Sequence, residues 1–365
     1  PSSFRLTRIA LASAVVATLS LTEAAAQSSY SVVVLASPGN FDLASDTNAG
    51  VTVGSTASGP AVAGRAAMWD GTTFLDLHPG ALLGSLTASR SNAVGVANGL
   101  QVGSGAGPAT ANRAVALVWR GSAESATILN LPFVYYSAQA LATDGVSVVG
   151  SAYGYDRDGT SIDTGHAMLW DLATGTAVDL GKGGQAFGVG GGQQVGHIIK
   201  GSATAALWRG TAKSLVSLHP RNATSSTAAA TDGVRQVGNA GYEVRVRAEA
   251  ANGNHSAIFT YATVWSGTAA SAINIHDGRF RHTYALGVSG PYIVGYGADQ
   301  AAIGTPAYFH ALVWDANLIA TDLNAFLPAG FVGATAYAVD SSGFIAGYAM
   351  SSTGQRRAVI WIPRS

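Results

Sequence analysis

Residues 140–180 read ALATDGVSVVGSAYGYDRDGTSIDTGHAMLWDLATGTAVDL, and the pattern in this stretch decides the fold. An alanine stands ten residues before Gly150, another alanine stands three residues before Trp170, and Val-Asp-Leu closes the stretch. The pair Asp144 and Gly145 favours a tight hairpin, because glycine readily takes a positive φ. We therefore expect four short antiparallel strands, ending at this turn, at the Val-Gly pair, at the tryptophan and at the closing leucine.

The pattern occurs seven times along the chain. It recurs at intervals of 38 to 57 residues, and the copies contain every tryptophan of the protein: Trp69, Trp119, Trp170, Trp208, Trp265, Trp314 and Trp361. A four-stranded unit of this size cannot bury both of its faces alone, so several units must pack around an axis. The seven copies predict seven propeller blades, and we assign all seven tryptophans to the packing between blades.

The seventh copy lacks a fourth strand after Trp361. Residues 30–35, YSVVVL, precede the first copy and have the β-branched, apolar character of a strand. Pairing them with the Trp361 strand would close the ring and remove an open edge. An open β-solenoid is the alternative, but it gives no reason for an extra strand at one end to match a missing strand at the other. The sequence thus predicts an all-β fold, a closed seven-bladed propeller over residues 27–365.

The beginning of the chain predicts export. Residues 1–26 contain Arg5 and Arg8, an apolar run and three alanines, which is the pattern of a cleaved signal peptide. A membrane anchor is the alternative, but the run is shorter than the roughly 20 residues that span a bilayer. Without cysteine the chain forms no disulfide, and its balance of 20 basic and 20 acidic residues argues against a nucleic-acid partner. We expect a secreted or periplasmic protein with no membrane span after signal removal.

The motifs HAMLW at 166–170 and HALVW at 310–314, with the Asp-Leu close, resemble the HAF-repeat (extracellular repeat) proteins of bacteria. The resemblance covers nearly the whole chain after residue 26 and implies export and repetition, without a shared reaction. The histidine of the motif is kept in two copies. In the other five, the position four before the tryptophan holds Arg65, Val115, Thr204, Tyr261 and Arg357. A common histidine-based site is therefore not expected.

Loop lengths indicate which face carries function. In an up-and-down blade, the turns after the first and third strands, such as Thr143–Gly145, emerge on one face, here named the turn face. The loops after the second strand and the crossovers to the next blade, such as His276–Tyr284, emerge on the opposite loop face. The first turns are short and uniform, whereas the segments from the repeated glycine to the tryptophan span 12 to 27 positions. Variable loops on a rigid scaffold usually carry binding or catalysis, so we expect function on the loop face.

The crossover His276–Tyr284, HDGRFRHTY, is the most chemically loaded segment of the loop face. Arginine offers a forked donor to a carboxylate or sulfate, and aromatic rings stack on sugars. The candidate ligand-binding residues of this face are Arg90, Tyr135, Tyr136, Arg279, Arg281, His282 and Tyr284. The alternative is that these are solvated loop residues with local hydrogen bonds.

A second candidate site lies in the segment YDRDGTSID, where Asp156, Asp158 and Asp163 surround Gly159. Three hard oxygen donors near a glycine turn partly resemble a calcium loop. The segment lacks the third early ligand and the twelfth-position glutamate of an EF-hand, and Asx turns explain the same residues. A structural calcium ion here is the only cofactor that the sequence suggests.

These features together predict an exported, non-catalytic propeller that binds an extracellular glycan or protein through its loop face. The alternative is a polysaccharide-active enzyme, a lyase or hydrolase with its site at the channel mouth. A lyase needs a base and a group that stabilises carboxylate charge, which His282, Tyr284 and Arg281 can supply. Paired carboxylates for hydrolysis are less evident, because the crossovers hold few acidic residues.

Overall fold

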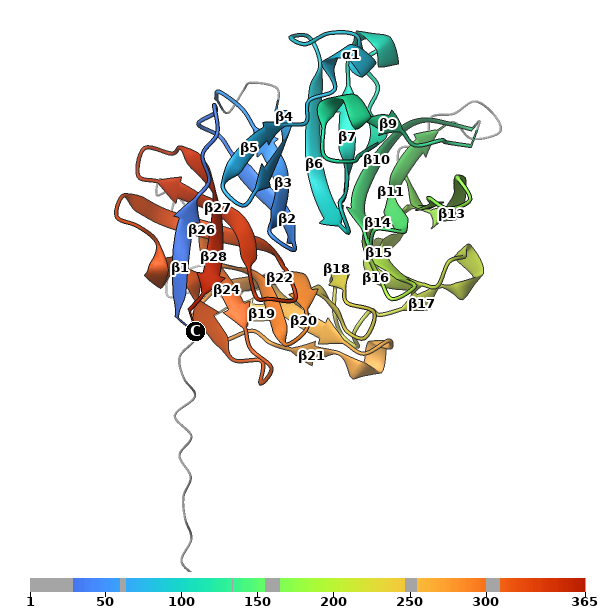
Figure 1. Cartoon of the computed structure of the whole chain (residues 1–365). Helices are drawn as coiled ribbons and strands as arrows, with labels where there is room; N and C mark the ends of the chain where they lie inside the picture. Colours follow the sequence, from blue (N-terminus) through green and yellow to red (C-terminus); the bar gives the residue numbers. More distant parts are fainter. Residues whose placement is uncertain are drawn as a thin grey trace, which may run out of the picture.

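Seven four-stranded antiparallel sheets surround one axis in the computed structural model (Figure 1). The structure describes residues 29–59, 64–132, 134–154, 165–246, 255–299 and 309–364. The first strand of every blade lines the central channel. The predicted closed seven-bladed β-propeller is thereby confirmed.

Six blades are each built from four consecutive strands. The first three are blade 1 with β2 (Leu43–Asn48), β3 (Val51–Thr56), β4 (Arg65–Asp70) and β5 (Thr73–Asp76); blade 2 with β6 (Arg90–Ala97), β7 (Leu100–Ala106), β8 (Val115–Trp119) and β9 (Thr127–Ile128); and blade 3 with β10 (Tyr135–Thr143), β11 (Ser147–Gly154), β12 (His166–Asp171) and β13 (Thr176–Lys182). The next three are blade 4 with β14 (Gly184–Gly190), β15 (Gln193–Lys200), β16 (Ser202–Trp208) and β17 (Val216–Ser217); blade 5 with β18 (Ser225–Thr231), β19 (Gln236–Val246), β20 (His255–Trp265) and β21 (Ile273–Asn274); and blade 6 with β22 (His282–Ser289), β23 (Tyr292–Ala298), β24 (Phe309–Trp314) and β25 (Ala320–Asp322).

Blade 7 joins the two ends of the propeller. Three of its strands are β26 (Phe331–Val339), β27 (Ile345–Ser351) and β28 (Arg356–Pro363), and the outer strand is β1 (Tyr30–Val34). β1 runs antiparallel to β28 with Val32 opposite Trp361. Figure 1 shows β1 in blue against the red strands of blade 7. The predicted closing strand is confirmed, and it covers the outer edge of β28.

Every first strand contains a β-bulge at the same place. The register between the first two strands slips directly after the repeated alanine, so one residue per blade has no partner on the second strand. These seven residues, here called the bulge ring, are Ser45, Val94, Leu141, Phe187, Ala229, Leu286 and Tyr337. All of them line the central channel. Because a bulge re-aims a side chain, the chain presents one residue per blade to the axis.

The bulge explains the repeated glycine of the second strand, which lies inside that strand and not at its end as the sequence predicted. In blade 3, Gly150 lies opposite Ala140. A Cβ atom on Gly150 would overlap the backbone carbonyl oxygen of Gln139, and the equivalent glycine of every other blade meets the equivalent carbonyl. A side chain at this position is therefore excluded by the backbone of the neighbouring strand.

All seven tryptophans are buried. Four of them donate the indole N–H to a carbonyl near the end of the preceding blade, at 2.7 to 3.3 Å: Trp69 to Ala36, Trp170 to Asn130, Trp314 to Ile275 and Trp361 to Leu323. The other three, Trp119, Trp208 and Trp265, have a buried indole N–H with no partner in the described part of the chain. The tryptophans thus divide the blades into two classes.

Other contacts follow the same division. In blades 1, 3, 6 and 7, here called acid–base blades, the residue four before the tryptophan is basic and meets an aspartate: Arg65 with Asp76, His166 with Asp179, His310 with Asp322 and Arg357 with Asp42. In blades 2, 4 and 5, here called glutamine blades, a second-strand glutamine bridges the two turns of its blade: Gln101, Gln194 and Gln236. Both devices tie strands together without changing the backbone of the blade.

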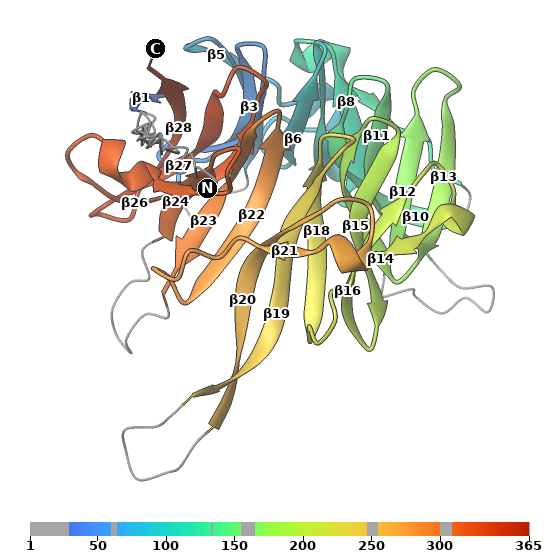
Figure 2. The same cartoon turned by 90° about the horizontal axis from the view of Figure 1, so that it is seen from below.

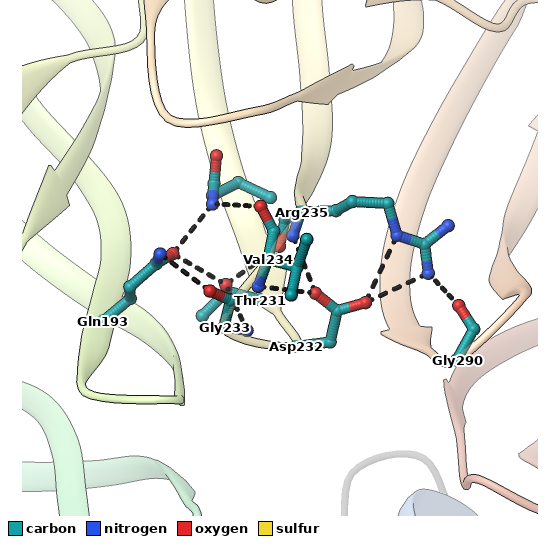
Figure 3. Close-up of polar contacts among 8 residues, drawn as sticks. Gln193, Thr231, Asp232, Gly233, Val234, Arg235 and Gly290 are labelled. Atoms are coloured by element: carbon teal, nitrogen blue, oxygen red, sulfur yellow. Dashed lines mark hydrogen bonds and ion pairs between the residues drawn. The ribbon is translucent and has the colours of Figure 1, made fainter.

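Hydrogen bonds between neighbouring blades link the first turns on the turn face. In blade 5, Asp232 pairs with the Arg235 guanidinium (3.0 Å), which also donates to the Gly290 carbonyl of blade 6 (Figure 3). From blade 4, the Gln193 amide donates to the turn of blade 5 at 2.8 Å (Figure 3). Asn98 makes similar contacts with the turns of blades 1 and 3. These contacts fix the rim of the channel on the turn face.

The helical segments are all short. They are α1 (Gly80–Leu83) and the 3-10 turns η1 (Pro108–Thr110), η2 (Ala123–Ser125), η3 (Ala212–Ser214), η4 (Ala269–Ser271) and η5 (Leu323–Phe326). Within the described ranges, no helix has the length and apolar character needed to cross a membrane.

Candidate functional site

A projecting hairpin distinguishes blade 5 on the loop face. Its strands β19 and β20 have 11 residues each, whereas the second strands of the other blades have 6 to 8. Figure 2 shows this hairpin extending well beyond its neighbours. Tyr242 lies opposite Phe259 in the hairpin and stacks on Tyr261 at 5.9 Å. The hairpin therefore carries aromatic side chains along the blade 5 side of the predicted crossover site.

The structure brings Arg281 and His282 together on Phe259 of this hairpin. The guanidinium of Arg281, an exposed residue, lies 5.4 Å from the centre of the Phe259 ring. The imidazole of His282 meets the same ring edge-on, with centroids 5.6 Å apart. A cation over an aromatic face is favourable and limits the orientations of the side chain. We name Phe259, Arg281 and His282 the blade 5–6 patch.

The protonation of His282 follows from its contacts. The backbone N–H of Thr260 donates to Nδ1 (3.2 Å), so in the neutral ring the proton is on Nε2. Burial, and after it the charge of Arg281, lowers the pKa of His282. At pH 7 the ring is therefore neutral and carries one N–H donor, at Nε2.

Arg279 has its charge balanced locally. Its Nη2 and Nε both donate to Oδ2 of Asp277, at 2.6 and 2.8 Å, and Nη2 also donates to the Ala320 carbonyl at 3.2 Å. It thereby joins the crossover to β25 of blade 6. Most of the N–H donors of Arg279 are therefore used within the protein.

Tyr284 lies in a different cluster. Its ring stacks on Tyr296 with centroids 4.7 Å apart and planes at 18°. Burial, and after it the neighbours Tyr284, Tyr337 and Tyr348, raises the pKa of Tyr296. Tyr284 therefore belongs to a group of tyrosines shared by blades 6 and 7, while Arg281 and His282 contact blade 5.

Tyr135 contacts the acid–base pair of its own blade, blade 3. Its hydroxyl donates to Asp179 (2.8 Å) and lies 3.0 Å from Nδ1 of His166, which itself stands 2.8 Å from the same carboxylate. Burial and the hydrogen bond to Asp179 raise the pKa of Tyr135. The three side chains join β10, β12 and β13 within blade 3.

The remaining two candidates lie apart from the patch. Tyr136 carries the guanidinium of Arg113 over its ring at 5.3 Å. Arg90 is exposed at the start of β6 and borders a cavity of about 280 Å³ that is lined mainly by blade 2, with residues of blades 1 and 3. The seven predicted residues thus lie at several places around the loop face. Among their contacts described above, Arg281 and His282 share one partner, Phe259.

Three crossover histidines have defined structural partners. His276 contacts the Thr283 hydroxyl (3.1 Å), which accepts the backbone N–H of Ala262 (3.0 Å). The same relay runs through Ser226 for His219 and through Ser91 for His78. Each relay joins the end of one blade to the start of the next, so these imidazoles hold the crossovers in place.

The predicted calcium residues Asp156, Asp158 and Asp163 lie outside the described residues. Within the described ranges, no group of three or more His, Asp or Glu side chains is arranged to hold a metal ion. The calcium site stays a prediction.

The sequence analysis did not predict the acidic cavity inside the central channel. A cavity of about 280 Å³ lies between the bulge ring and the turn face, and Asp46 and Asp340 are its acidic residues. Asp46 stands two residues after the repeated alanine. In the other blades that position holds a small residue: Gly95, Ala142, Gly188, Ala230, Gly287 and Ala338. This break in the repeat is the signal that points to the site.

The closed ring, the bulged first strands and the variable loop face define a seven-bladed β-propeller. The β-propeller domain of the Trilobed protease from Pyrococcus furiosus aligns with a TM-score of 0.52 at 8% identity, over 91% of this chain and 95% of that domain. That domain has an open velcro topology, whereas β1 closes the ring here.

Two peptidase-like structures are also similar. The acylaminoacyl peptidase of Pyrococcus horikoshii has a TM-score of 0.50 at 11% identity, and a puromycin hydrolase has 0.50 at 14%. Each match covers 89% of this chain and 52% of the other, so the chain spans about half the length of these proteins. At such identities the likeness shows the fold alone. No family model and no curated protein matches the chain.

Proposed function

We propose that this chain is a non-catalytic binding propeller, related to the HAF-repeat proteins and exported to the periplasm or the medium, whose loop face binds a glycan or protein partner. The observation that carries the proposal is the blade 5–6 patch. An exposed arginine is held over Phe259, beside a neutral histidine that offers an N–H donor.

The chemistry of the patch favours an acidic glycan. Arg281 supplies a charged, planar donor fork that suits a carboxylate or sulfate. The aromatic residues of the hairpin, Phe259 and Tyr242, supply surfaces against which sugar rings pack. Because His282 is neutral, its Nε2–H adds a directional hydrogen bond without more charge.

The contacts of Tyr284 favour binding over the lyase alternative. A lyase that used all three residues would need the base, the proton donor and the charge-stabilising group at one reacting carbon. His282 lies against β20, whereas the Tyr284 ring is stacked on Tyr296 of β23. The third member, Arg281, also lies against β20.

A glycan array that contains neutral, carboxylated and sulfated oligosaccharides tests the proposal. We expect the protein to retain acidic oligosaccharides, and the double variant Arg281→Ala/His282→Ala to bind them at least tenfold more weakly. Arg209→Ala, which removes an exposed arginine on the turn face, is the matched control and should bind like the parent. Unchanged binding by the double variant would refute the assignment. Release of unsaturated sugar products from a bound oligosaccharide would show an enzyme instead.

A further inference from the structure

The central channel offers a binding site on the opposite side of the molecule from the blade 5–6 patch. Its cavity of about 280 Å³ is lined by first-strand residues of all seven blades and reaches the exposed Ser341 in the turn after β26. The volume is slightly below the range of about 300–1,000 Å³ that holds drug-sized ligands. The channel therefore suits a compact small molecule.

The wall of the channel has a polar side and an apolar side. Ser45 and Tyr337 are the polar members of the bulge ring, and they come from blades 1 and 7, which are neighbours in the ring through the contacts of β2 with β26 and β27. The other five members, from blades 2 to 6, are Val94, Leu141, Phe187, Ala229 and Leu286. At the level of the bulge ring, a ligand therefore meets hydroxyl groups on one side and hydrocarbon on the other.

The polar side also carries both acidic groups of the cavity. Asp46 of blade 1 is held by the backbone N–H groups of Thr47 and Val96, each at 2.8 Å. Asp340 of blade 7 is buried and accepts the N–H groups of Ser342 and Phe344. Both residues line the same cavity from neighbouring blades, and the charge of Asp340 adds to the rise in the pKa of Asp46. No Lys, Arg or His is among the described lining residues, so the cavity contains acid without a balancing base.

Several hydroxyl groups in this half have no hydrogen-bond partner in the described part of the chain. The side chains of Ser45, Ser289, Ser341 and Tyr337 make no hydrogen bond among the described residues, although all four line the cavity. A polar group that faces a cavity without a protein partner is available to a ligand or to water. These hydroxyls flank Asp46 and Asp340 in blades 6, 7 and 1.

We propose that the channel binds a small organic amine with an apolar body. The ammonium group would lie between the Asp46 and Asp340 carboxyl groups, with the neighbouring hydroxyls as further acceptors. The body would pack on Leu141 and Phe187 across the channel. The rim suits such a ligand because contacts such as Arg235 with Gly290 (Figure 3) already fix the turns around the opening, so little order is lost on binding.

Titration calorimetry with 2-phenylethylamine as the probe, and the uncharged 2-phenylethanol as its isostere, tests the proposal. We expect the amine to bind at least tenfold more tightly than the alcohol. Ala229→Leu places a leucine in the bulge ring of blade 5, like Leu141 of blade 3 and Leu286 of blade 6. It should abolish amine binding by filling the cavity. Asp46→Asn should weaken amine binding at least tenfold.

The controls keep the test decisive if one variant is unstable. Asp171→Asn changes an aspartate that also accepts two backbone N–H groups but does not line the cavity, and it should leave binding unchanged. Equal affinity for amine and alcohol would overturn the role of the acids, and amine binding that survives in Ala229→Leu would overturn the location. Calcium binding that disappears in Asp46→Asn, without amine binding, would replace the amine with a metal ion.

Discussion

The Asp46 carboxylate of blade 1 accepts the backbone N–H of Val96 in blade 2 at 2.8 Å. This contact joins blade 1 to blade 2. At the position of Asp46 in the repeat, two residues after the alanine, the other six blades have glycine or alanine. Burial is the main reason that the pKa of Asp46 is raised from 3.8 to about 7, with Asp340 adding to the rise and the two backbone N–H groups opposing it.

The raised pKa makes stability depend on pH. Between about pH 4 and 7 the folded state holds a proton that the unfolded state has released, so the contribution of Asp46 falls as the pH rises through this window. Asparagine cannot ionise. We expect the free energy of unfolding of Asp46→Asn to rise by about 3 kcal/mol relative to that of the parent between pH 4.5 and pH 8 in urea unfolding. A constant difference across that range would contradict the raised pKa.

The two classes of tryptophan predict different costs for the same substitution. Trp314 donates to the Ile275 carbonyl at 2.9 Å in a buried site, whereas the indole N–H of Trp265 has no partner among the described residues. Trp314→Phe leaves a buried carbonyl unpaired, so it should destabilise the protein by about 1 kcal/mol more than Trp265→Phe. Chemical denaturation of both variants measures the difference, and equal losses would mean that the hydrogen bond contributes nothing.

The repeated glycine of the second strand should tolerate no side chain. In Gly150→Ala the new Cβ overlaps the Gln139 carbonyl and the Ala140 backbone, so relief requires the bulge to shift, at a cost of about 3 kcal/mol. The control Gly64→Ala places its Cβ no nearer than 3.8 Å to any neighbour and should stay within about 0.5 kcal/mol of the parent. A Gly150→Ala protein with parental stability would show that the bulge can move.

His310 and Asp322 form an acid–base pair at 2.7 Å that should be visible in titrations. The hydrogen bond to Asp322 raises the pKa of His310, and His310 lowers the pKa of Asp322 against the opposing effect of burial. The stabilisation from His310 is lost as the pH rises through its raised pKa. That from Asp322 is lost as the pH falls through its lowered one.

NMR titration checks this pair. Asp322→Asn should lower the pKa of His310, because the partner of the imidazolium is removed. His197, whose pKa is lowered by burial alone, is the internal control and should not change. An unchanged pKa for His310 would show that another group stabilises its charge.

The closing strand can be tested by deletion. A chain without residues 29–37 exposes the outer edge of β28 and leaves Trp361 without the strand that faces it, so we expect aggregation or a much lower melting temperature. Ser31→Ala, which removes only a 3.4 Å side-chain contact with the Ile362 carbonyl, is the control and should melt near the parent. A deletion protein that melts like the parent would refute the closure.

The number of blades and their closure could be predicted because each blade needs one large residue and several small ones at fixed spacing. Trp361 without a fourth strand and the unassigned strand at Tyr30 then had one common explanation. The bulge was not predicted, because its extra residue is present in every copy and leaves the spacing between alanine and glycine unchanged. Gly150 cannot carry a side chain because the Gln139 carbonyl occupies that space, and this contact exists only once the two strands are paired.

The candidate site was predictable only as a list of reactive residues. The sequence identified Arg279, Arg281 and Tyr284 as near neighbours in the chain. It could not show that Arg279 is bound by Asp277, that Arg281 lies on Phe259, or that Tyr284 stacks on Tyr296, because two of these partners come from other strands. Asp46 was readable as a break in the repeat, but its meaning depends on the channel that seven separate strands enclose.

The pairing of β1 with β28 sets an order on folding. The Ser31 hydroxyl contacts the carbonyl of a residue 331 positions away, whereas strands within each of the other blades follow one another directly. Contacts between such distant segments form late, because a long loop must first be closed. Blades 1 to 6 can therefore form in order during synthesis, because their strands are consecutive. β1 stays unpaired until β28 has been made. The ring can then close only after β28 (Arg356–Pro363) has been synthesised, because β1 has no other strand with which to pair.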